Sequence, residues 1–257
     1  MKNKQSDEII GEFVFELNKA NCIEDCFQLL VYQIENLGFL GITYSFIPKN
    51  IKILNNTPLF LCSKEFNSQF LEHYQAANFA QDDFTIKHIL SGKMDILNWW
   101  QEEEKGILLP PQKKVIEVAK EEYHIRNGLS IPTLSNASYI AGASLISDNK
   151  NTLFNLLLKE KMKIANYLIQ EFHKHIENQI NYKKFFYLPL LEILTKQEKQ
   201  VLFHAVSGQP LKTIQDEYDI SSTRAGNIRT HLFKKLDVKN INQLTYLAGL
   251  HDLLEML

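Results

Sequence analysis

The chain of 257 residues has few cysteines and no apolar run of membrane-spanning length. Cys22, Cys26 and Cys62 form an odd set without zinc-ligand spacing, so we expect reduced thiols that mostly pack in the interior. A bilayer span needs about twenty apolar residues, and the polar, charged start of the chain lacks the hydrophobic region of a signal peptide. These absences predict a cytoplasmic protein with no membrane partner.

The sequence also lacks an excess of one charge sign, with 28 lysines and arginines against 30 acids. This balance excludes the whole-protein attraction to polyanions that a histone-like binder shows. Positive charge is instead concentrated in residues 221–239, where Asp237 is the one acid. The basic residues of this segment are Arg224, Arg229, Lys234, Lys235 and Lys239.

Enzyme motifs are missing as well. We find no nucleophile elbow, no metal-ligand spacing and no phosphate-binding loop, and the histidines of the first two thirds are scattered. An alternative class is a small-molecule hydrolase fused to a DNA-binding tail. We predict a binding protein without catalytic activity, metal or cofactor.

Residues 194–238 have the pattern of a helix-turn-helix. Thr195 and Glu198 form a capping box before the first helix, which Gly208 ends. A short second helix follows, and Ser221 to Thr223 offer hydroxyl caps for a third. In the third helix we expect four apolar residues to face inward, at Ala225, Ile228, Leu232 and Leu236. The opposite, basic face can enter a major groove, although the bland alternative is the solvated face of an ordinary helical bundle.

The first two thirds of the chain mixes helices and strands. Amphipathic patterns predict helices at 6–19, 23–36, 64–77, 109–122 and 152–177. Aromatic and β-branched runs predict strands at 38–48, 57–62, 124–134 and 138–147, the last two joined by a polar turn. The predicted fold class is α+β: an α/β/α sandwich with a central antiparallel sheet, followed by an all-α four-helix helix-turn-helix domain.

We place the domain boundaries by the change in pattern. Residues 1–179 form the predicted sensor and dimerisation domain, 180–190 a linker, and 191–257 the DNA-binding domain. The linker contains Pro189, and its aromatic residues Phe185, Phe186 and Tyr187 are too apolar for a free tether. We therefore expect the linker to pack on one of the domains.

The whole chain resembles the LuxR-type quorum-sensing transcription factors. In the C-terminal part the matching residues are Leu194, Thr195, Glu198, Val201, Leu202, Gly208, Ile214, Ile220, Ser221, Lys235, Leu236 and Val238. In the N-terminal part they are LGF at 37–39, EHY at 72–74, Asp83, Thr85, Trp99 or Trp100, GLSIP at 128–132 and GASL at 142–145. The resemblance implies an N-terminal domain that binds an acyl-homoserine lactone and a C-terminal domain that binds DNA.

The resemblance also implies a set of ligand-binding residues. Asp83 matches the acceptor for the ligand amide N–H, Tyr74 offers a phenol to a ligand carbonyl, and Thr85 adds a hydroxyl. The remaining expected contacts are Phe66, Phe70, Trp99, Trp100, Ser144 and Leu145. The alternatives are that Asp83 is a solvated loop acid, that Tyr74 and the tryptophans are ordinary core residues, and that Gly128 meets a backbone requirement.

Several positions depart from the family pattern. Phe70 stands where the family usually has a tryptophan that holds the lactone carbonyl, and phenylalanine has no donor. Phe84 replaces the proline after the aspartate, and Leu145, with Ser144 adjacent, stands where a serine is often found. We expect a modified signal, a different small amphiphile or no ligand.

For DNA, the resemblance places base contacts at Gly226, Asn227 and Thr230. Asn227 is the best base reader because its amide can pair bidentately with adenine. Thr223, Arg224, Arg229 and Lys234 are expected to contact phosphates. The predicted function is a dimeric transcriptional regulator that binds double-stranded DNA under control of a small amphiphile. The alternative is an orphan regulator that ignores small molecules and dimerises constitutively.

Overall fold

The computed structural model describes residues 2–52, 54, 58–66 and 68–257. The helices of the larger, N-terminal part are α1 (Lys2–Leu17), α2 (Ile23–Asn36), α4 (Ser68–Ala76), η1 (Phe79–Gln81), α5 (Phe84–Leu90), α6 (Trp99–Glu104), α7 (Pro110–Glu121) and α8 (Asn151–Glu177). The strands are β1 (Gly41–Pro48), β2 (Leu61–Cys62), β3 (Leu97–Asn98), β4 (Asn127–Ser135) and β5 (Tyr139–Ser147). No helix in these ranges has both the length and the apolar character needed to cross a bilayer.

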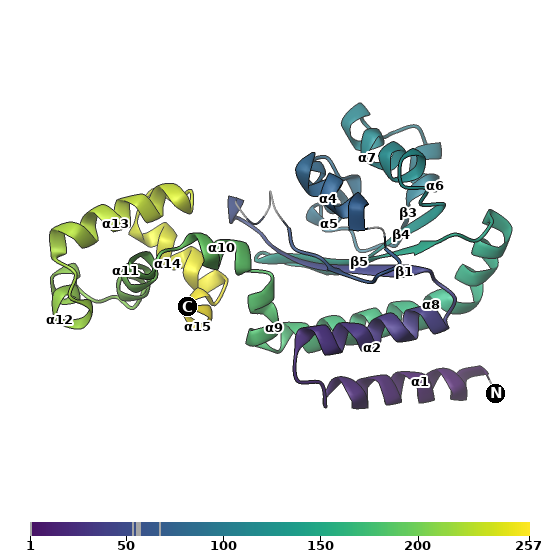
Figure 1. Cartoon of the computed structure of the whole chain (residues 1–257), viewed down its shortest axis with the longest axis horizontal. Coiled ribbons are helices and arrows are strands. Elements are labelled where there is room, and N and C mark those ends of the chain that lie inside the picture. The colour runs from purple at the N-terminus through teal and green to yellow at the C-terminus, as the bar shows by residue number, and fades with distance from the viewer. Residues whose placement is uncertain (1, 53, 55–57, 67) are drawn as a thin grey trace.

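The strands form one antiparallel sheet in the order β2-β1-β5-β4-β3. Figure 1 shows α4 to α7 over one face of this sheet, while α2 and α8 cover the other and α1 packs outside them. The predicted α/β/α sandwich with a central antiparallel sheet is therefore confirmed. The N-terminal part of this architecture ends with α8, the longest helix of the described chain.

Side chains alternate between the two faces of β1 and β5, as strand geometry requires. On β1, Tyr44 and Phe46 point into the core beneath α2 and α8, while Thr43 and Ser45 face α4 to α7. On β5, Leu145 lies in that same core and Ser144 faces the opposite side. Both strands are buried on both faces, so alternate residues belong to two different buried regions, the core on one side and the space beneath α4 to α7 on the other.

The remaining helices are α9 (Ile180–Phe185), α10 (Leu188–Ile193), α11 (Lys196–Val206), η2 (Leu211–Thr213), α12 (Ile214–Tyr218), α13 (Ser222–Lys235), α14 (Ile241–Leu250) and α15 (Leu253–Met256). The predicted capping box exists: Glu198 N donates to Thr195 Oγ1 at 3.2 Å, and Thr195 N to Glu198 Oε2 at 2.8 Å. Gly208 follows α11 with a φ of 75°, a conformation that favours glycine. Ser221 caps α13.

Some expected elements differ from those observed. No helix or strand was predicted between the helices expected at 64–77 and 109–122, but this stretch contains η1, α5, β3 and α6. The linker expected at 180–190 consists of α9 and the start of α10 rather than an extended segment. The strand expected at 57–62 is observed at Leu61–Cys62, and the helix expected at 64–77 at Ser68–Ala76; residues 57 and 67 lie outside the described ranges.

The linker packs between the sheet and the C-terminal helices, so it contacts both parts of the chain rather than the one domain that we expected. Phe186 and Tyr187 are buried, and Tyr187 Oη lies 2.9 Å from Nδ1 of His251, which is also fully buried. Tyr139, the first residue of β5, packs edge-on against the His251 ring at a centroid distance of 5.5 Å. Lys183 Nζ forms an ion pair with Asp252 at 3.3 Å. One hydrophobic core therefore runs from α1 and α2 through the linker into the helix-turn-helix.

Three histidines of the described residues are buried, and two of them, His173 and His251, each lie beside a tyrosine of this core. His173 Nδ1 lies 2.8 Å from the Tyr44 hydroxyl, and His251 Nδ1 pairs with Tyr187 as described. Within the described residues, the Nε2 atom of each is buried without a hydrogen-bond partner. Burial lowers the pKa of both imidazoles to about 4. Both side chains are therefore neutral at pH 7.

We expect acid to destabilise the fold through these histidines. The unfolded chain binds protons on them below a pKa of about 6.5, whereas the folded chain does so only near pH 4, so stability falls as pH drops through that window. His251→Asn keeps a polar atom near Tyr187 but removes the titration. Between pH 7 and pH 5, the free energy of unfolding of this variant, measured by chemical denaturation, should fall by about 2 kcal/mol less than that of the wild type. His231→Asn, at an exposed histidine of α13, is the matched control, and equal pH dependence of the His251 variant and the wild type would contradict the assignment.

Candidate functional site

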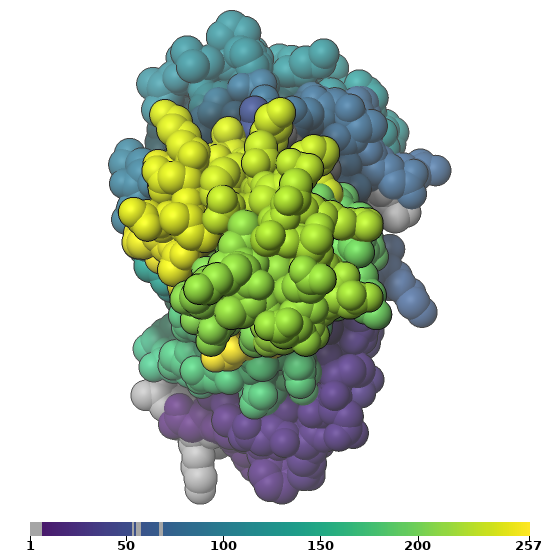
Figure 2. Space-filling view, turned by 90° about the vertical axis from the view of Figure 1, so that its left-hand side faces the viewer, coloured from purple at the N-terminus to yellow at the C-terminus, as the bar shows by residue number. Residues whose placement is uncertain are grey.

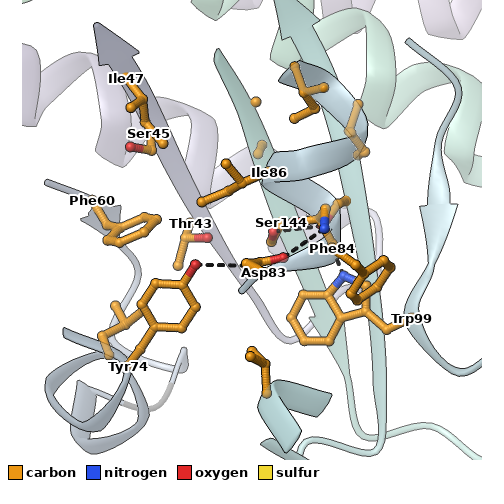
Figure 3. A pocket seen from close by; sticks show the side chains of 18 of the residues that line it. Thr43, Ser45, Ile47, Phe60, Tyr74, Asp83, Phe84, Ile86, Trp99 and Ser144 are labelled. Carbon is orange, nitrogen blue, oxygen red and sulfur yellow. Dashed lines mark hydrogen bonds between the residues drawn. The ribbon is translucent and has the colours of Figure 1, made fainter. Parts of the chain in front are cut away.

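A cavity lies between the sheet and the helices α4 to α7 (Figure 3). It has a volume of about 90 Å³ and is lined mainly by apolar and aromatic side chains. Most of the predicted ligand-binding residues line it together: Phe66, Phe70, Tyr74, Asp83, Thr85, Trp99 and Ser144. Their roles in binding stay predictions, but the fold brings them to one enclosed place.

Two of the predicted ligand contacts, Leu145 and Trp100, do not line the cavity. Leu145 is fully buried in the core on the opposite face of the sheet, because neighbouring residues of a strand point to opposite sides. Trp100 follows Trp99 on α6 and turns away from the cavity, where its indole N–H donates to the carbonyl of Arg126. Ser144 and Trp99 are the members of each pair that reach the cavity.

Asp83 is held by two hydrogen bonds from the protein. Its Oδ1 accepts from the backbone N–H of Thr85 at 2.7 Å and caps the N-terminus of α5. Its Oδ2 accepts from the Tyr74 hydroxyl at 2.8 Å. The alternative of a freely solvated loop acid is therefore excluded. Each carboxylate oxygen can accept a further bond, so Asp83 can still bind a donor in the cavity.

Tyr74 donates its hydroxyl proton to Asp83 rather than into open space. Burial, and then the adjacent Asp83 carboxylate, raises the pKa of Tyr74 well above its ordinary value, so the phenol stays protonated. A phenol has one proton. Tyr74 can therefore donate to a ligand carbonyl only by giving up its bond to Asp83.

Trp99 forms one wall of the cavity and is fixed by a glycine and a serine. Its indole N–H donates to Ser130 Oγ at 2.9 Å. A Cβ atom on Gly128 would lie 2.2 Å from Trp99 Cε3, so only glycine leaves room for the ring. Gly128 therefore leaves room for the Trp99 ring and does not serve a positive backbone φ.

The sequence reasoning missed a row of hydroxyl groups on the cavity floor. Thr43, Ser144 and Ser130 face one another on β1, β5 and β4, since Ser144 is in register with both other residues. Ser130 Oγ and Ser144 Oγ are 3.2 Å apart. Ser45, one pair further along β1, donates to the Leu59 carbonyl. The alternation of each strand carries this signal, but the pairing register is needed to see the row.

The cavity wall at Phe70 is aromatic. Phe70 packs against Tyr74 at a ring-centroid distance of 6.0 Å and against Phe66 at 6.4 Å. Tyr123 covers its other side at 5.5 Å. This end of the cavity offers a ligand apolar ring surface where the family pattern would place an indole N–H.

The second candidate site is the outward face of α13. Thr223, Arg224, Asn227, Thr230 and Lys234 are exposed, while Gly226 and Arg229 are partly exposed. Ala225 and Leu232 are buried and Ile228 is partly buried, so the predicted inward stripe is confirmed. Figure 2 shows the yellow-green segment that contains α13 at the surface of the helix-turn-helix end of the molecule.

Not every cation of this segment is free. Lys235 Nζ donates to both carboxylate oxygens of Glu198 at 2.8 Å and to the Ile193 carbonyl at 3.0 Å. Burial alone would raise the pKa of Glu198, but hydrogen bonds from Lys235 and Thr195 outweigh it and lower that pKa. Arg224 donates to the Gln197 side chain at 2.7 Å. Lys234 and Arg229 have no recorded ion pair among the described residues.

The described residues contain no group of three or more His, Cys, Asp or Glu side chains placed to hold a metal ion. What the two sites offer is a partly polar cavity and a basic helical face.

Two protein families match the chain. Residues 23–176 match the family described as autoinducer binding domain, and residues 192–248 match the family described as bacterial regulatory proteins, luxR family. The chain therefore belongs to the LuxR family and joins an autoinducer-binding domain to a LuxR-type helix-turn-helix. Members of this family are DNA-binding transcription regulators and not enzymes. A search of curated proteins finds no match.

Solved structures share the fold. The crystal structure of Escherichia coli SdiA superposes with a TM-score of 0.52 at 15% identity, covering 95% of this chain and 97% of SdiA. SdiA in complex with octanoyl-rac-glycerol gives a TM-score of 0.51 at 16% identity, with 95% of each chain covered. CepR2 of Burkholderia cenocepacia gives 0.52 at 15% identity, covering 66% of this chain and 95% of CepR2. The predicted fold class is confirmed over both parts of the chain.

We expect Gly128→Ala to disturb the cavity wall. The added methyl group collides with Trp99, which must shift and lose its bond to Ser130, at a cost of about 1 to 3 kcal/mol in unfolding free energy. Gly11→Ala is the control, because a Cβ there meets nothing within 4 Å. Chemical denaturation and tryptophan fluorescence measure both effects. Wild-type stability and emission in the Gly128 variant would contradict this packing.

Adjacent lysines of α13 should behave differently. Lys235→Ala leaves the buried Glu198 carboxylate without its cation and should lower the unfolding free energy by about 1 to 3 kcal/mol. Lys234→Ala removes an exposed charge and should change it by less than about 0.5 kcal/mol. Urea denaturation of the two variants tests this contrast, which equal stabilities would contradict.

Proposed function

We propose that this protein is a transcriptional regulator in which a small amphiphile, of the acyl-homoserine-lactone kind, binds the cavity and controls dimerisation and operator binding. The observation that carries the proposal is the cavity itself. It places Asp83, Tyr74 and Trp99 around one enclosed, largely aromatic space in the same chain as an exposed basic helix. An apolar cavity with a few convergent polar groups is the usual form of a small-molecule site.

Relatives of the same fold support an acylated ligand. SdiA has been solved with octanoyl-rac-glycerol, and CepR2 is described as N-acylhomoserine lactone dependent. An apolar tail suits the aromatic wall at Phe66 and Phe70, and a donor on the head group suits the open lone pairs of Asp83. A ligand that binds only the folded chain stabilises it, by about 2.7 kcal/mol at a hundred times its dissociation constant.

In this proposal α13 enters the major groove of the operator. Asn227 reads a base through its exposed amide, with Gly226 and Thr230 beside it on the same face. Thr223, Arg224, Arg229 and Lys234 contact phosphates, which Arg224 reaches by leaving Gln197. A single short module reads few bases, so two copies on two half-sites give the needed specificity. The regulator therefore acts as a homodimer.

One observation favours a second candidate, a regulator that needs no ligand. Both oxygens of Asp83 already accept hydrogen bonds from the protein, and the cavity volume is small. Because these polar groups are already paired within the protein, the chain does not need a ligand in order to fold. Purification from the native host, followed by mass spectrometry of bound small molecules, separates the two candidates. A stoichiometric amphiphile supports the first, and its absence together with full operator binding supports the second.

We expect Asn227→Ala and Lys234→Ala to separate base reading from phosphate binding. With an operator enriched from host promoter fragments, Asn227→Ala should reduce specific affinity by about 1 to 3 kcal/mol and leave binding to random DNA unchanged. Lys234→Ala should weaken binding to both about equally and reduce the salt dependence. Titration by fluorescence anisotropy at two salt concentrations measures this. Equal losses on specific and random DNA for both variants would refute the assignment.

A further inference from the structure

The hydroxyl row on the cavity floor holds an unused proton. Ser130 and Ser144 together carry two hydroxyl protons, and the bond between their oxygens uses one of them. The Trp99 indole is a pure donor to Ser130, so it cannot accept the other. Among the described residues no further acceptor is recorded for these hydroxyls. Whichever way the bond between the serines runs, one serine proton is left facing the cavity.

On the helical side of the cavity, the Asp83 carboxylate can accept more hydrogen bonds than the protein donates to it. Its two oxygens each accept one protein hydrogen bond and can each accept another. No lysine or arginine forms an ion pair with it among the described residues. Figure 3 shows Asp83 and Ser144 both directed into the cavity, with Thr43 beside them. The carboxylate therefore attracts a neutral donor and repels an anionic head group.

A single hydroxyl group satisfies both needs. It accepts the leftover serine proton through its oxygen and donates its own proton to Asp83, which completes an oriented chain from Trp99 to the carboxylate. An acyl-homoserine lactone can meet these needs only with two separate groups, its amide N–H as donor and a carbonyl as acceptor, whereas one hydroxyl meets both at a single point. The N–H of Trp99 and the O–H of Tyr74 are already used inside the protein, and Phe70 supplies no donor.

We infer that the cavity takes a neutral alcohol: a ligand with an apolar body and a hydroxyl head group, bound between the Ser130–Ser144 pair and Asp83. This inference rests on the proposed function and specifies its ligand class. The hydroxyl can belong to an aliphatic acyl polyol or to an alkylphenol, which share this chemistry. An acyl lactone binds more weakly, and a fatty carboxylate is excluded by the charge of Asp83.

Direct binding to the full-length protein tests the ligand class. The probes are 1-octanoylglycerol, 4-octylphenol, N-octanoyl homoserine lactone and octanoate, measured by thermal melting and by isothermal titration calorimetry. We expect at least one of the two alcohols to raise the melting temperature and to bind about tenfold or more tightly than the lactone, with no shift for octanoate. The stronger alcohol identifies the aliphatic or the aromatic source.

Variants test the assigned atoms. Ser144→Ala removes a link of the chain, and Asp83→Asn keeps an N-cap but removes the charge, so each should weaken alcohol binding about tenfold. Thr133→Val is the matched control on β4, because the Thr133 hydroxyl lacks a hydrogen-bond partner and does not line the cavity. It should bind like the wild type.

The outcomes are distinguishable. Tighter binding of the lactone than of both alcohols, or unchanged alcohol affinity in Ser144→Ala, overturns the hydroxyl inference and leaves the proposed ligand-responsive function standing. If none of the four probes binds, the hydroxyl inference fails, and the ligand-responsive function is decided separately by whether an amphiphile co-purifies from the native host.

Discussion

The alternation of side chains along β1 and β5 is the constraint on which both halves of this regulator depend. Each strand is covered on both sides, so every second residue belongs to a different interior. Thr43 and Ser144 face the cavity, while Tyr44 and Leu145 pack beneath α2 and α8. A shift in register of one residue would exchange the two sets, placing apolar side chains on the cavity floor and hydroxyls in the dry core. Alternate residues of the same two strands thus form the cavity floor and part of the core beneath α2 and α8.

These strands also reach the DNA-binding part. Tyr139 begins β5 and touches His251, and its following residues form the cavity floor. The opposite face of β1 meets the linker, where Phe46 and Phe186 are 5.9 Å apart between ring centroids. The sensor and the helix-turn-helix therefore share one packed core rather than a tether. Side chains in contact therefore connect β5 with His251, the residue that follows α14.

Strong local signals were readable from the sequence, and weak or long-range ones were not. The Thr195 and Glu198 capping box, the inward stripe of α13 and the long helix α8 follow from spacing alone, and all are present. The short helices α5 and α9 were missed because two turns of helix carry little periodicity and depend on tertiary packing. Leu145 was predicted together with Ser144 because the resemblance points to a stretch of sequence, whereas the sheet decides which of two neighbouring residues faces the cavity. The hydroxyl row joins three strands from distant parts of the chain, so only the pairing register could reveal it.

The bond between Lys235 and Glu198 limits how strongly this protein responds to salt. A cation that neutralises a DNA phosphate releases condensed counterions, and each such contact adds about 0.9 to the slope of the logarithm of affinity against the logarithm of salt concentration. Lys235 is already neutralised within the domain, so it releases none. Lys235 thus stabilises the helix-turn-helix domain without adding to the sequence-independent attraction to DNA. The protein consequently remains less attached to bulk chromosomal DNA than its count of basic residues suggests.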